Sequence, residues 1–463
     1  MDQNLITRRK FMKGAAAAST LTILPAGIYG KGGPAGNTPN NRLNIALVGV
    51  GGRGTSAFRE LYDQNIVALC DVDDARVEAS FEKAIGTPSE FAEYLNNLPN
   101  IPRYKDFRRM FDEMGDAIDA VVVSTPDHMH FPIAMWAIQL GKHVYVEKPL
   151  TRTVWEARTL TEAARKHGVI TQMGNQGHSR DGTRIVREWI DAGVIGDVRE
   201  VQHWTNRPIW PQGLDAPDHS ELIPVVLNSL DWDLWLGVAP ERPYDPSYCP
   251  FSWRGWWDFG SGAFGDMACH IMDAAYWSLD LGHPTSVEAV STAFNEYSAP
   301  NASIVTFQFP ARGNKPPVKV TWSDGGLKPI IPPEFEKDFE FDRSGTLLIG
   351  EHATLKCGEY GGSPRIVPET MMQELRSSLP PKTIPRVKGG PHKEWVEACK
   401  GGPKCGSNFD YSGPFTEVVQ LGNAAIRARR KLEWDGPNMK FTNDPEANKY
   451  VGSTYEYRKG WGV

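Results

Sequence analysis

Short apolar runs alternate with helix-like segments over the first part of the chain. Five of these runs have almost no polar interruption, which is typical of strands buried on both faces of a parallel sheet. Residues 55–62 and 154–167 lie between runs and have a helix-like pattern. The five runs are 43–48, 66–70, 120–124, 143–146 and 169–173. This alternation predicts a doubly wound α/β domain over residues 33–175.

The pattern changes after residue 175. Four strand-like segments follow with few helix-like segments between them, which predicts a second domain built on a mainly antiparallel sheet. Proline-rich stretches at 328–333 and 380–391 predict loops, and late helices are expected at 392–399 and 415–432. The strand-like segments are 198–204, 285–294, 303–309 and 318–323. The expected fold class is α/β plus α+β, with residues 176–463 as a sheet domain carrying C-terminal helices and an arm.

A glycine-rich turn follows the first predicted strand. Gly49, Gly51, Gly52 and Gly54, with Arg53 among them, fit the spacing G-x-G-x-x-G between a strand and a helix. Glycines let a pyrophosphate approach backbone N–H groups at a helix N-terminus, where the helix dipole favours negative charge. An ordinary glycine-rich turn is the alternative, and the strand, turn, helix and strand in order argue against it. The motif predicts a Rossmann domain that binds a dinucleotide.

The second predicted strand ends at Asp71. An acid about 20 residues after the glycines accepts hydrogen bonds from a ribose diol and disfavours a 2′-phosphate, so NAD is expected over NADP. Arg53 and Arg76 could contact a 2′-phosphate, so NADP is the alternative cofactor.

Polar residues also follow the next two predicted strands. Thr125, Pro126 and His130 come after the third, and Glu147 and Lys148 come after the fourth. Open parallel sheets bind ligands at the carboxyl ends of their strands. We therefore expect these residues to surround the nicotinamide end of a bound NAD.

Asp266 and His270 are the second group of candidate catalytic residues. They lie four positions apart, so a helix would present both side chains on one face, where a carboxylate and an imidazole can act on one substrate. Taken alone, a helix cap at Asp266 and a buried core histidine are the more common explanation of such a pair. Oxidation of a secondary alcohol needs a proton acceptor, and histidine titrates near neutrality.

Three motifs together resemble one known family. The glycine motif, Glu147-Lys148-Pro149 and Asp266-x-x-x-His270 are similar to those of the glucose-fructose oxidoreductase, inositol dehydrogenase and MocA family, abbreviated Gfo/Idh/MocA. The resemblance implies a Rossmann domain joined to an open-faced sheet domain, with a sugar or cyclitol hydroxyl as substrate. It also implies that Lys148 orients the hydroxyl and polarises the developing carbonyl, that His270 accepts its proton, and that Asp266 binds substrate.

Tryptophans favour a sugar as the substrate. Eight of the 15 tryptophans lie between Trp204 and Trp277, around the predicted catalytic helix, and such rings stack on the apolar C–H faces of sugars. Core packing is the alternative for each ring. The predicted substrate-binding residues besides Asp266 and His270 are Trp210, Trp253 and Trp257 with His178, Arg207 and Arg254, and Gln176 is assigned to the cofactor.

The N-terminus resembles a twin-arginine export signal. Arg8 and Arg9 precede an apolar, alanine-rich stretch over residues 14–30, which is shorter than the roughly 20 residues of a membrane span. We expect residues 1–32 to be a signal and linker, a periplasmic location, and no stable membrane span in the mature chain. An uncleaved membrane anchor is the alternative.

Composition and charge limit the classes of partner and cofactor that the chain is expected to bind. The chain has 50 basic and 56 acidic residues and a net charge of −6, so it lacks the basic excess that nucleic-acid binding needs. No cysteine and histidine cluster has zinc spacing, so no metal is predicted. A disulfide between Cys399 and Cys405 is left open.

The patterns Gly-Asn-Gln-Gly-His and Trp-Arg-Gly-Trp-Trp-Asp resemble those of exported members of this family. The resemblance implies oxidation of a secondary hydroxyl at C3 of a glycoside or disaccharide, and the NAD is expected to be tightly bound. An exported enzyme has no free NAD pool, so a second sugar or a redox partner would reoxidise the cofactor. An NAD-dependent glycosidase and a sugar sensor without turnover are the alternatives. The family resemblance further implies a homo-oligomer, either a dimer or a tetramer.

Overall fold

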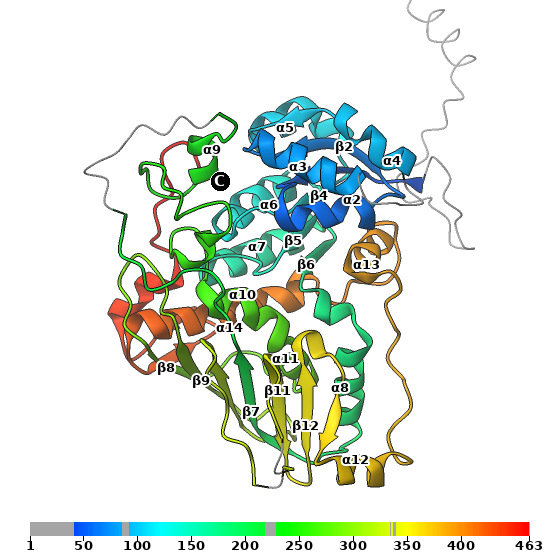
Figure 1. Cartoon of the computed structure of the whole chain (residues 1–463), viewed down its shortest axis with the longest axis vertical. Helices are drawn as coiled ribbons and strands as arrows, with labels where there is room; N and C mark the ends of the chain where they lie inside the picture. The colour runs from blue at the N-terminus through cyan, green and yellow to red at the C-terminus, as the bar shows by residue number, and fades with distance from the viewer. Residues whose placement is uncertain (1–40, 86–91, 218–227, 334, 337–338, 463) are drawn as a thin grey trace, which may run out of the picture. The chain divides into compact units, whose positions relative to one another are not determined.

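The computed structural model describes residues 41–462 except for 86–91, 218–227, 334 and 337–338. Residues Arg42–Val463 form one compact unit (Figure 1). The predicted export signal and linker, residues 1–32, lie outside the described residues. The boundary that we predict at residue 175 falls inside this unit, and it stays a prediction.

The first sheet has six parallel strands in the order β3-β2-β1-β4-β5-β6. This order confirms the predicted Rossmann arrangement. The strands are β1 Asn44–Val48, β2 Asn65–Cys70, β3 Arg103–Tyr104, β4 Ala120–Val123, β5 His143–Glu147 and β6 Thr171–Gly174.

Both faces of this sheet are covered, as its continuous apolar runs predict. Ile45 and Leu47 of β1 pack on one face, and Ala46 and Val48 pack on the other, in two separate clusters of buried side chains. The first cluster also contains Trp395, which lies in helix α13, Gly390–Cys399. A late segment of the chain therefore returns to cover the nucleotide-binding sheet.

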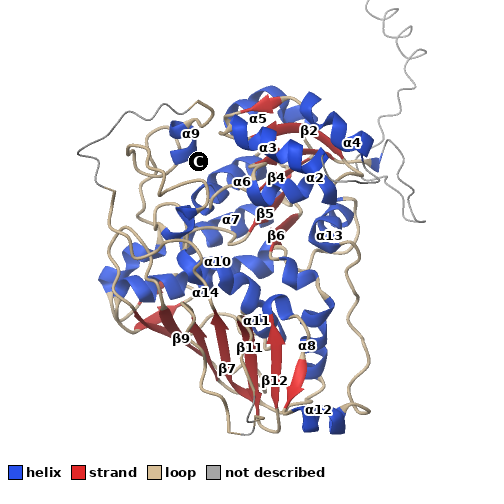
Figure 2. Cartoon of the chain, in the orientation of Figure 1, coloured by secondary structure: helices blue, strands red, loops and turns tan. Residues whose placement is uncertain are grey.

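The second sheet has nine strands in the order β13-β12-β11-β7-β10-β9-β8-β14-β15 (Figure 2). Only β7 and β10 run parallel among its strand pairs, which confirms a mainly antiparallel sheet. The strands are β7 Val198–Thr205, β8 Ser286–Ser291, β9 Ser303–Phe309, β10 Val318–Ser323, β11 Ser344–Gly350, β12 Thr354–Gly358, β13 Arg365–Val367, β14 Leu432–Asp435 and β15 Lys440–Phe441.

The prediction missed β11, β12 and β13, and also β3, β14 and β15. Strands β11 to β13 contain glycine or charged residues, so their apolar pattern is weak in the sequence. Pairing supplies what the local pattern lacks, since β11 pairs with β7, β12 with β11 and β13 with β12. Leu347 and Leu348 of β11 are fully buried there.

Three long helices lie between the two sheets (Figure 1): α7 Val154–His167, α10 Gly262–Ile271 and α14 Phe409–Ala428. Helix α14 contacts α7 and β6 on one side and β8 and β9 on the other. It begins six residues before the predicted start because Pro414 is tolerated inside it, and it ends at Arg429, which has a left-handed φ of 56°. Residue 432 belongs to β14 rather than to this helix.

The remaining helices complete the fold. No described helix has both the length and the hydropathy to cross a bilayer. The α-helices are α2 Ala57–Glu60, α3 Asp74–Ile85, α4 Ala92–Asn97, α5 Phe107–Met114, α6 His130–Gln139, α8 Asp181–Asp191, α9 Trp232–Leu236, α11 Asp273–Ser278 and α12 Glu369–Leu375. The short 3-10 helices are η2 Gly52–Ser56, η3 Leu98–Asn100, η4 Gly115–Ala117, η5 Asp127–Met129, η6 Gln176–Ser179, η7 Ser252–Gly255, η8 Glu359–Gly361 and η9 Pro445–Val451.

No disulfide bond forms among the described residues. Cys399 ends α13 and Cys405 lies in the loop that follows it, and both are free thiols in this structure. The possible disulfide between them is not formed.

We predict that Gly54→Ala destabilises the protein. A Cβ atom at residue 54 would lie 1.9 Å from the carbonyl oxygen of Gly49, so the turn after β1 would have to open. The expected loss in free energy of unfolding is about 1–3 kcal/mol, measured by urea denaturation. Gly115→Ala is the control, because nothing lies within 4 Å of a Cβ there and its φ is −51°. Equal stability of both variants would contradict the prediction.

Candidate active site

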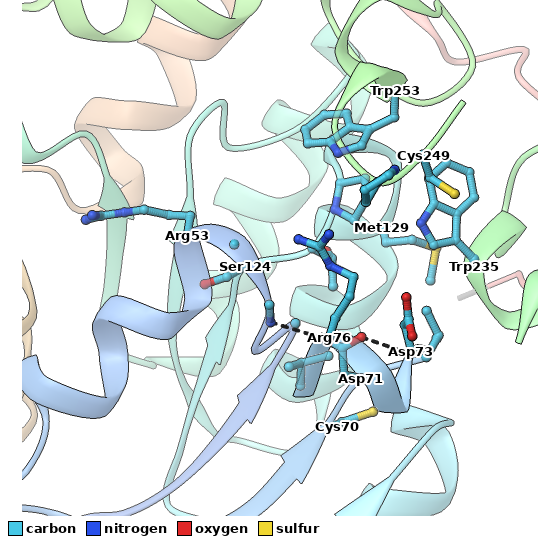
Figure 3. A pocket seen from close by; sticks show the side chains of 18 of the residues that line it. Arg53, Cys70, Asp71, Asp73, Arg76, Ser124, Met129, Trp235, Cys249 and Trp253 are labelled. Carbon is cyan, nitrogen blue, oxygen red and sulfur yellow. Dashed lines mark hydrogen bonds between the residues drawn. The ribbon is translucent and has the colours of Figure 1, made fainter. Parts of the chain in front are cut away.

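A cavity of about 460 Å³ lies at the carboxyl ends of β1, β2, β4 and β5. This is the edge at which parallel sheets bind ligands. Figure 3 shows Asp71 and Arg76 on the Rossmann side of the cavity, with Trp235, Cys249 and Trp253 from the later chain facing them. The predicted residues that line it are Gly49, Gly51, Gly52, Arg53, Asp71, Thr125, Pro126, Glu147, Lys148, Trp253, Arg254 and Asp266.

The glycine turn is organised around Asp71. Its Oδ2 accepts hydrogen bonds from the backbone N–H groups of Val50, at 2.8 Å, and Gly51, at 3.2 Å. Its Oδ1 accepts one from the N–H of Asp73 at 3.1 Å. Burial raises the pKa of Asp71 above its ordinary value, and these backbone donors oppose that rise. The acid therefore fixes the turn as well as facing the cavity.

The glycine turn fits a dinucleotide. Gly49 has a left-handed φ of 79°, and a Cβ at that position would lie 2.7 Å from the backbone of Ser124. Arg53 donates from Nε to Oε1 of Glu147 at 3.0 Å, which ties the turn to the end of β5. A pyrophosphate would lie against the backbone of Gly51 and Gly52, and the ribose would lie at Asp71.

At the other end of the cavity, Lys148 and Asp266 form an ion pair. The Nζ of Lys148 donates to both the backbone oxygen and Oδ1 of Asp266, each at 2.8 Å. The Nε of Arg254 reaches the same Oδ1 at 3.2 Å. Burial opposes ionisation of Asp266, but the two cations outweigh it and lower its pKa to about 2. Asp266 therefore stays charged and holds the Lys148 ammonium at the cavity wall.

His270 lies one turn further along α10 but does not line the cavity. Its ring contacts Tyr360 with centroids 4.7 Å apart, and its buried Nδ1 has no hydrogen-bond partner among the described residues. Burial and the nearby Lys148 lower the pKa of His270 well below its usual value, so the imidazole is neutral at neutral pH. A neutral imidazole can accept a proton.

Several predicted residues support the site without lining the cavity. Gly54 packs against the backbone of Gly49. The ring nitrogens of His130 lie 2.8 Å from the carbonyl oxygen of Pro149 and 2.9 Å from that of Thr125, so His130 joins the two loops that carry Pro126 and Lys148. The Trp210 ring lies 5.8 Å from the guanidinium of Arg254.

Other predicted residues lie elsewhere. Gln176 begins η6, and the Nδ1 of His178 in the same helix lies 3.0 Å from both carboxylate oxygens of Asp273 in the interior. Arg207 follows β7 and accepts a backbone hydrogen bond from Gly325. Trp257 packs under the guanidinium of Arg427, away from the cavity. The structure does not bring these four residues to the cavity wall.

The cavity wall also contains residues that the sequence analysis missed. Asp127 directly follows Pro126 after β4, so the strand-end argument could have included it. Lys105, Trp235 and Trp461 come from three distant parts of the chain, and no local signal marks them. Among the described residues, no group of three or more histidines, cysteines or acids could hold a metal ion.

Comparison with known proteins supports one family. Residues 43–175 match the profile of an oxidoreductase family, NAD-binding Rossmann fold, and residues 210–307 match the profile of its C-terminal alpha/beta domain. The levoglucosan dehydrogenase of Pseudarthrobacter phenanthrenivorans is 27% identical over 190 residues, which cover 40% of this chain and 38% of that protein. A glycosyl hydrolase family 109 protein of Solibacter usitatus is 31% identical over 171 residues, 35% of this chain and 36% of that protein. The match thus spans less than two fifths of these relatives.

Solved structures share the fold. The WlbA dehydrogenase from Bordetella pertussis, in complex with NADH and UDP-GlcNAcA, is 15% identical with a TM-score of 0.55, covering 85% of this chain and 99% of that one. The inositol dehydrogenase homolog from Azotobacter vinelandii, with NADH and myo-inositol, is 16% identical with a TM-score of 0.53, covering 85% and 98%. With its two matched profiles, its two sheets and its Lys148, Asp266 and His270 motifs, this chain belongs to the Gfo/Idh/MocA oxidoreductase family.

Proposed function

We propose that this protein is an NAD-dependent oxidoreductase that oxidises a secondary hydroxyl of a carbohydrate, at C3 of a glycoside or disaccharide. The observation that carries the proposal is the Lys148–Asp266 pair, which lies in the wall of the same cavity as the glycine turn. A dinucleotide bound by that turn would extend along the strand ends toward this pair. Similarity to a levoglucosan dehydrogenase supports a sugar as substrate.

Lys148, Asp266 and His270 each have a chemical task in this reaction. When bound, NAD supplies the acceptor for the hydride that leaves the carbon atom. The Lys148 ammonium donates a hydrogen bond to the substrate oxygen and stabilises the negative charge that grows on it. Asp266 keeps that ammonium in place because its pKa of about 2 leaves it ionised at any working pH. His270 holds a neutral imidazole that can take up the hydroxyl proton.

Aromatic and cationic side chains would bind the sugar next to this pair. The Arg254 guanidinium lies 4.3 Å from the ring centroid of Trp253 and 4.5 Å from that of Phe251, and all three residues line the cavity. A sugar can stack its C–H face on such a ring while its hydroxyls bond to the guanidinium.

Tight cofactor binding is part of the proposal. Trp461, near the C-terminus, lines the cavity, lies 4.0 Å below the Arg108 guanidinium and is 6% exposed. Arg108 also donates to the carbonyl oxygen of Gly460 at 3.0 Å. On the same side, Lys105 donates to the carbonyl oxygen of Ser229 at 3.1 Å. Two later segments of the chain thus contribute to the wall of the dinucleotide site, and their contacts would slow release of NAD.

We propose, from the twin-arginine pattern at Arg8 and Arg9, that the folded, loaded enzyme is exported to the periplasm. Bound NADH would then be reoxidised by a second sugar or a redox partner. We also propose a homo-oligomer, a dimer or a tetramer, on the family resemblance. Similarity to glycosyl hydrolase family 109 proteins favours one second candidate, an NAD-dependent glycosidase that oxidises C3, eliminates the glycosidic bond and reduces the sugar again.

We expect the purified protein, without added cofactor, to develop the near-ultraviolet band of reduced nicotinamide when a methyl glycoside or disaccharide is added. NMR of the sugar should then show a 3-keto product. Cleavage of the sugar without a lasting band would instead identify the glycosidase, and the absence of both would favour a sensor.

We predict that Lys148→Ala lowers the rate of hydride transfer at least about 100-fold, because the developing oxyanion loses its cation. The variant should still carry NAD, since the glycine turn is intact. Lys166→Ala is the matched control, because Lys166 is exposed at the end of α7. Stopped-flow absorbance measures the rate, and a fully active Lys148→Ala enzyme would exclude the assigned role.

We predict that the Trp461→Ala variant releases NAD about tenfold faster than the wild-type protein. This factor corresponds to a loss of about 1.4 kcal/mol in binding free energy. Trp434→Ala is the control, since Trp434 is 7% exposed and packs on Phe441 outside the cavity. The NAD that remains after repeated gel filtration is measured by absorbance. Equal retention by the two variants would show that Trp461 does not hold the cofactor.

A further inference from the structure

Oxidation of an alcohol to a ketone releases one proton for each hydride transferred. Bound NAD would take the hydride from the carbon atom, and the hydroxyl proton must pass to a group of the protein or to water. This inference rests on the proposed function and concerns the route of that proton.

The groups already assigned do not store the proton. Asp266 has a pKa of about 2 and stays ionised. His270 lies outside the cavity wall, and its pKa is well below the usual value, so an imidazolium there readily releases its proton. A second acceptor in the wall can then take the proton onward.

The Asp127 carboxyl group lies in the cavity wall, and its surroundings suit a proton acceptor. It is 4% exposed, and its Oδ2 accepts a hydrogen bond from Oγ of Ser261 at 2.9 Å. Burial raises the pKa of Asp127 to about 7. Lys148, at the end of β5, and Arg254, in η7, oppose this rise, and Asp266 on α10 adds to it.

Ser261 connects Asp127 to a second, smaller cavity. The residue precedes α10, is 2% exposed and lines a cavity of about 30 Å³. The Nε2 of Gln420 donates to the Ser261 Oγ at 3.3 Å and to the carbonyl oxygen of Thr151 at 2.9 Å. These contacts hold the hydroxyl between the two cavities.

The second cavity is large enough for a water molecule, and its lining offers polar partners for one. A water needs roughly 10–15 Å³ and two to four polar partners. The lining residues include buried polar atoms without a partner among the described residues: Nε and Nη2 of Arg152, Nε1 of Trp257 and Oδ1 of Asn423. Two further lining residues, Arg427 and Tyr450, are only partly buried, so this cavity lies near the surface.

We propose that Asp127 and Ser261 form a proton exit route from the active site to a water molecule in the second cavity. The Asp127 carboxylate accepts the proton that His270 takes from the reacting hydroxyl and then releases, and Asp127 becomes a carboxylic acid. That acid then donates its proton to the Ser261 oxygen, while the Ser261 hydroxyl proton passes to the water. The hydroxyl can turn to do this, because its hydrogen is free to rotate about the C–O bond. Reduction of a ketone uses the same route in reverse.

The route predicts a particular pH dependence. The Asp127 carboxylate accepts a proton only when ionised, so hydride transfer from sugar to NAD should slow as the pH falls through about 7. The hydrogen bond from Ser261 stabilises the charged carboxylate and so lowers its pKa. Without that hydroxyl the pKa rises, and the fall in rate should begin at a higher pH.

The test measures single-turnover reduction of bound NAD by methyl β-glucoside and by sucrose, in light and heavy water, over a range of pH. Ser261→Ala should lower the rate about tenfold, increase the solvent isotope effect and move the acidic fall to higher pH. Asp127→Asn should lower the rate about 100-fold and remove that fall. Ser278→Ala is the matched control, because Ser278 is also buried but its Oγ bonds to the carbonyl oxygen of Ala275 in α11.

Bound NAD, measured after gel filtration, shows that each variant is folded. Hydride transfer with an unchanged rate, pH profile and isotope effect in both Ser261→Ala and Asp127→Asn would overturn the route and leave the proposed function standing. If Ser261→Ala does not fold, Asp127→Asn decides alone by the same criteria. Absence of hydride transfer in the wild-type protein with both sugars would overturn the proposed function, and the route with it.

Discussion

The ion pair between Lys148 and Asp266 is the contact on which the site depends, because its two partners come from opposite parts of the fold. Lys148 follows β5 of the parallel sheet, and Asp266 lies on α10, which packs against the second sheet. Burying either charge alone would cost several kcal/mol, so each requires the other. Arg254 adds a second cation to the same carboxylate. The two sheets must therefore keep one relative position for these charges to meet.

Helix α14 and the polar residues around it help to hold that position. The helix contacts both sheets, and its Gln420 and Asn423 bond to the Thr151 and Ser261 segments that lead into the Lys148 loop and into α10. These bonds are buried, where an unsatisfied partner would be costly. A substrate pocket at the join between two sheets thus depends on a helix that does not itself line the pocket.

Burial in the cavity wall changes the electrostatics of the acidic side chains there. Later segments of the chain, including Trp235 and Trp461, form part of the cavity wall at the strand ends. In such a setting, charges interact more strongly than in water, and burial shifts the pKa of each acid in the direction set by its neighbours. Asp266 and Asp127 show this contrast: the first is held ionised by adjacent cations, and the second, whose nearest bonded neighbour is a serine hydroxyl, titrates near neutrality. Two carboxyl groups in one wall can therefore perform different tasks.

The Rossmann half and its glycine turn could be predicted because their signals are local. Periodicity alone gave the limits of α7, β9 and β10, and the strand-end argument placed Thr125, Pro126, Glu147 and Lys148 at the cavity. The same argument stopped short of Asp127, one residue further on. Strands β11 to β13 were missed because their stability comes from pairing with one another and, through β11, with β7, rather than from their own pattern. His178 and Trp257 were assigned to the substrate by residue type, but their side chains are used in the interior.

What the sequence by itself determined is therefore the nucleotide-binding fold, the glycine turn with Asp71, and the pairing of Lys148 with the Asp266–His270 motif by resemblance. Only the tertiary structure decided which tryptophans face the cavity, that α13 returns to the first sheet, and that Trp461 lines the site. The physical reason is that hydrophobic periodicity and strand-end position depend on neighbours along the chain. Burial, pKa and enclosure depend on neighbours in space, which a single sequence does not specify.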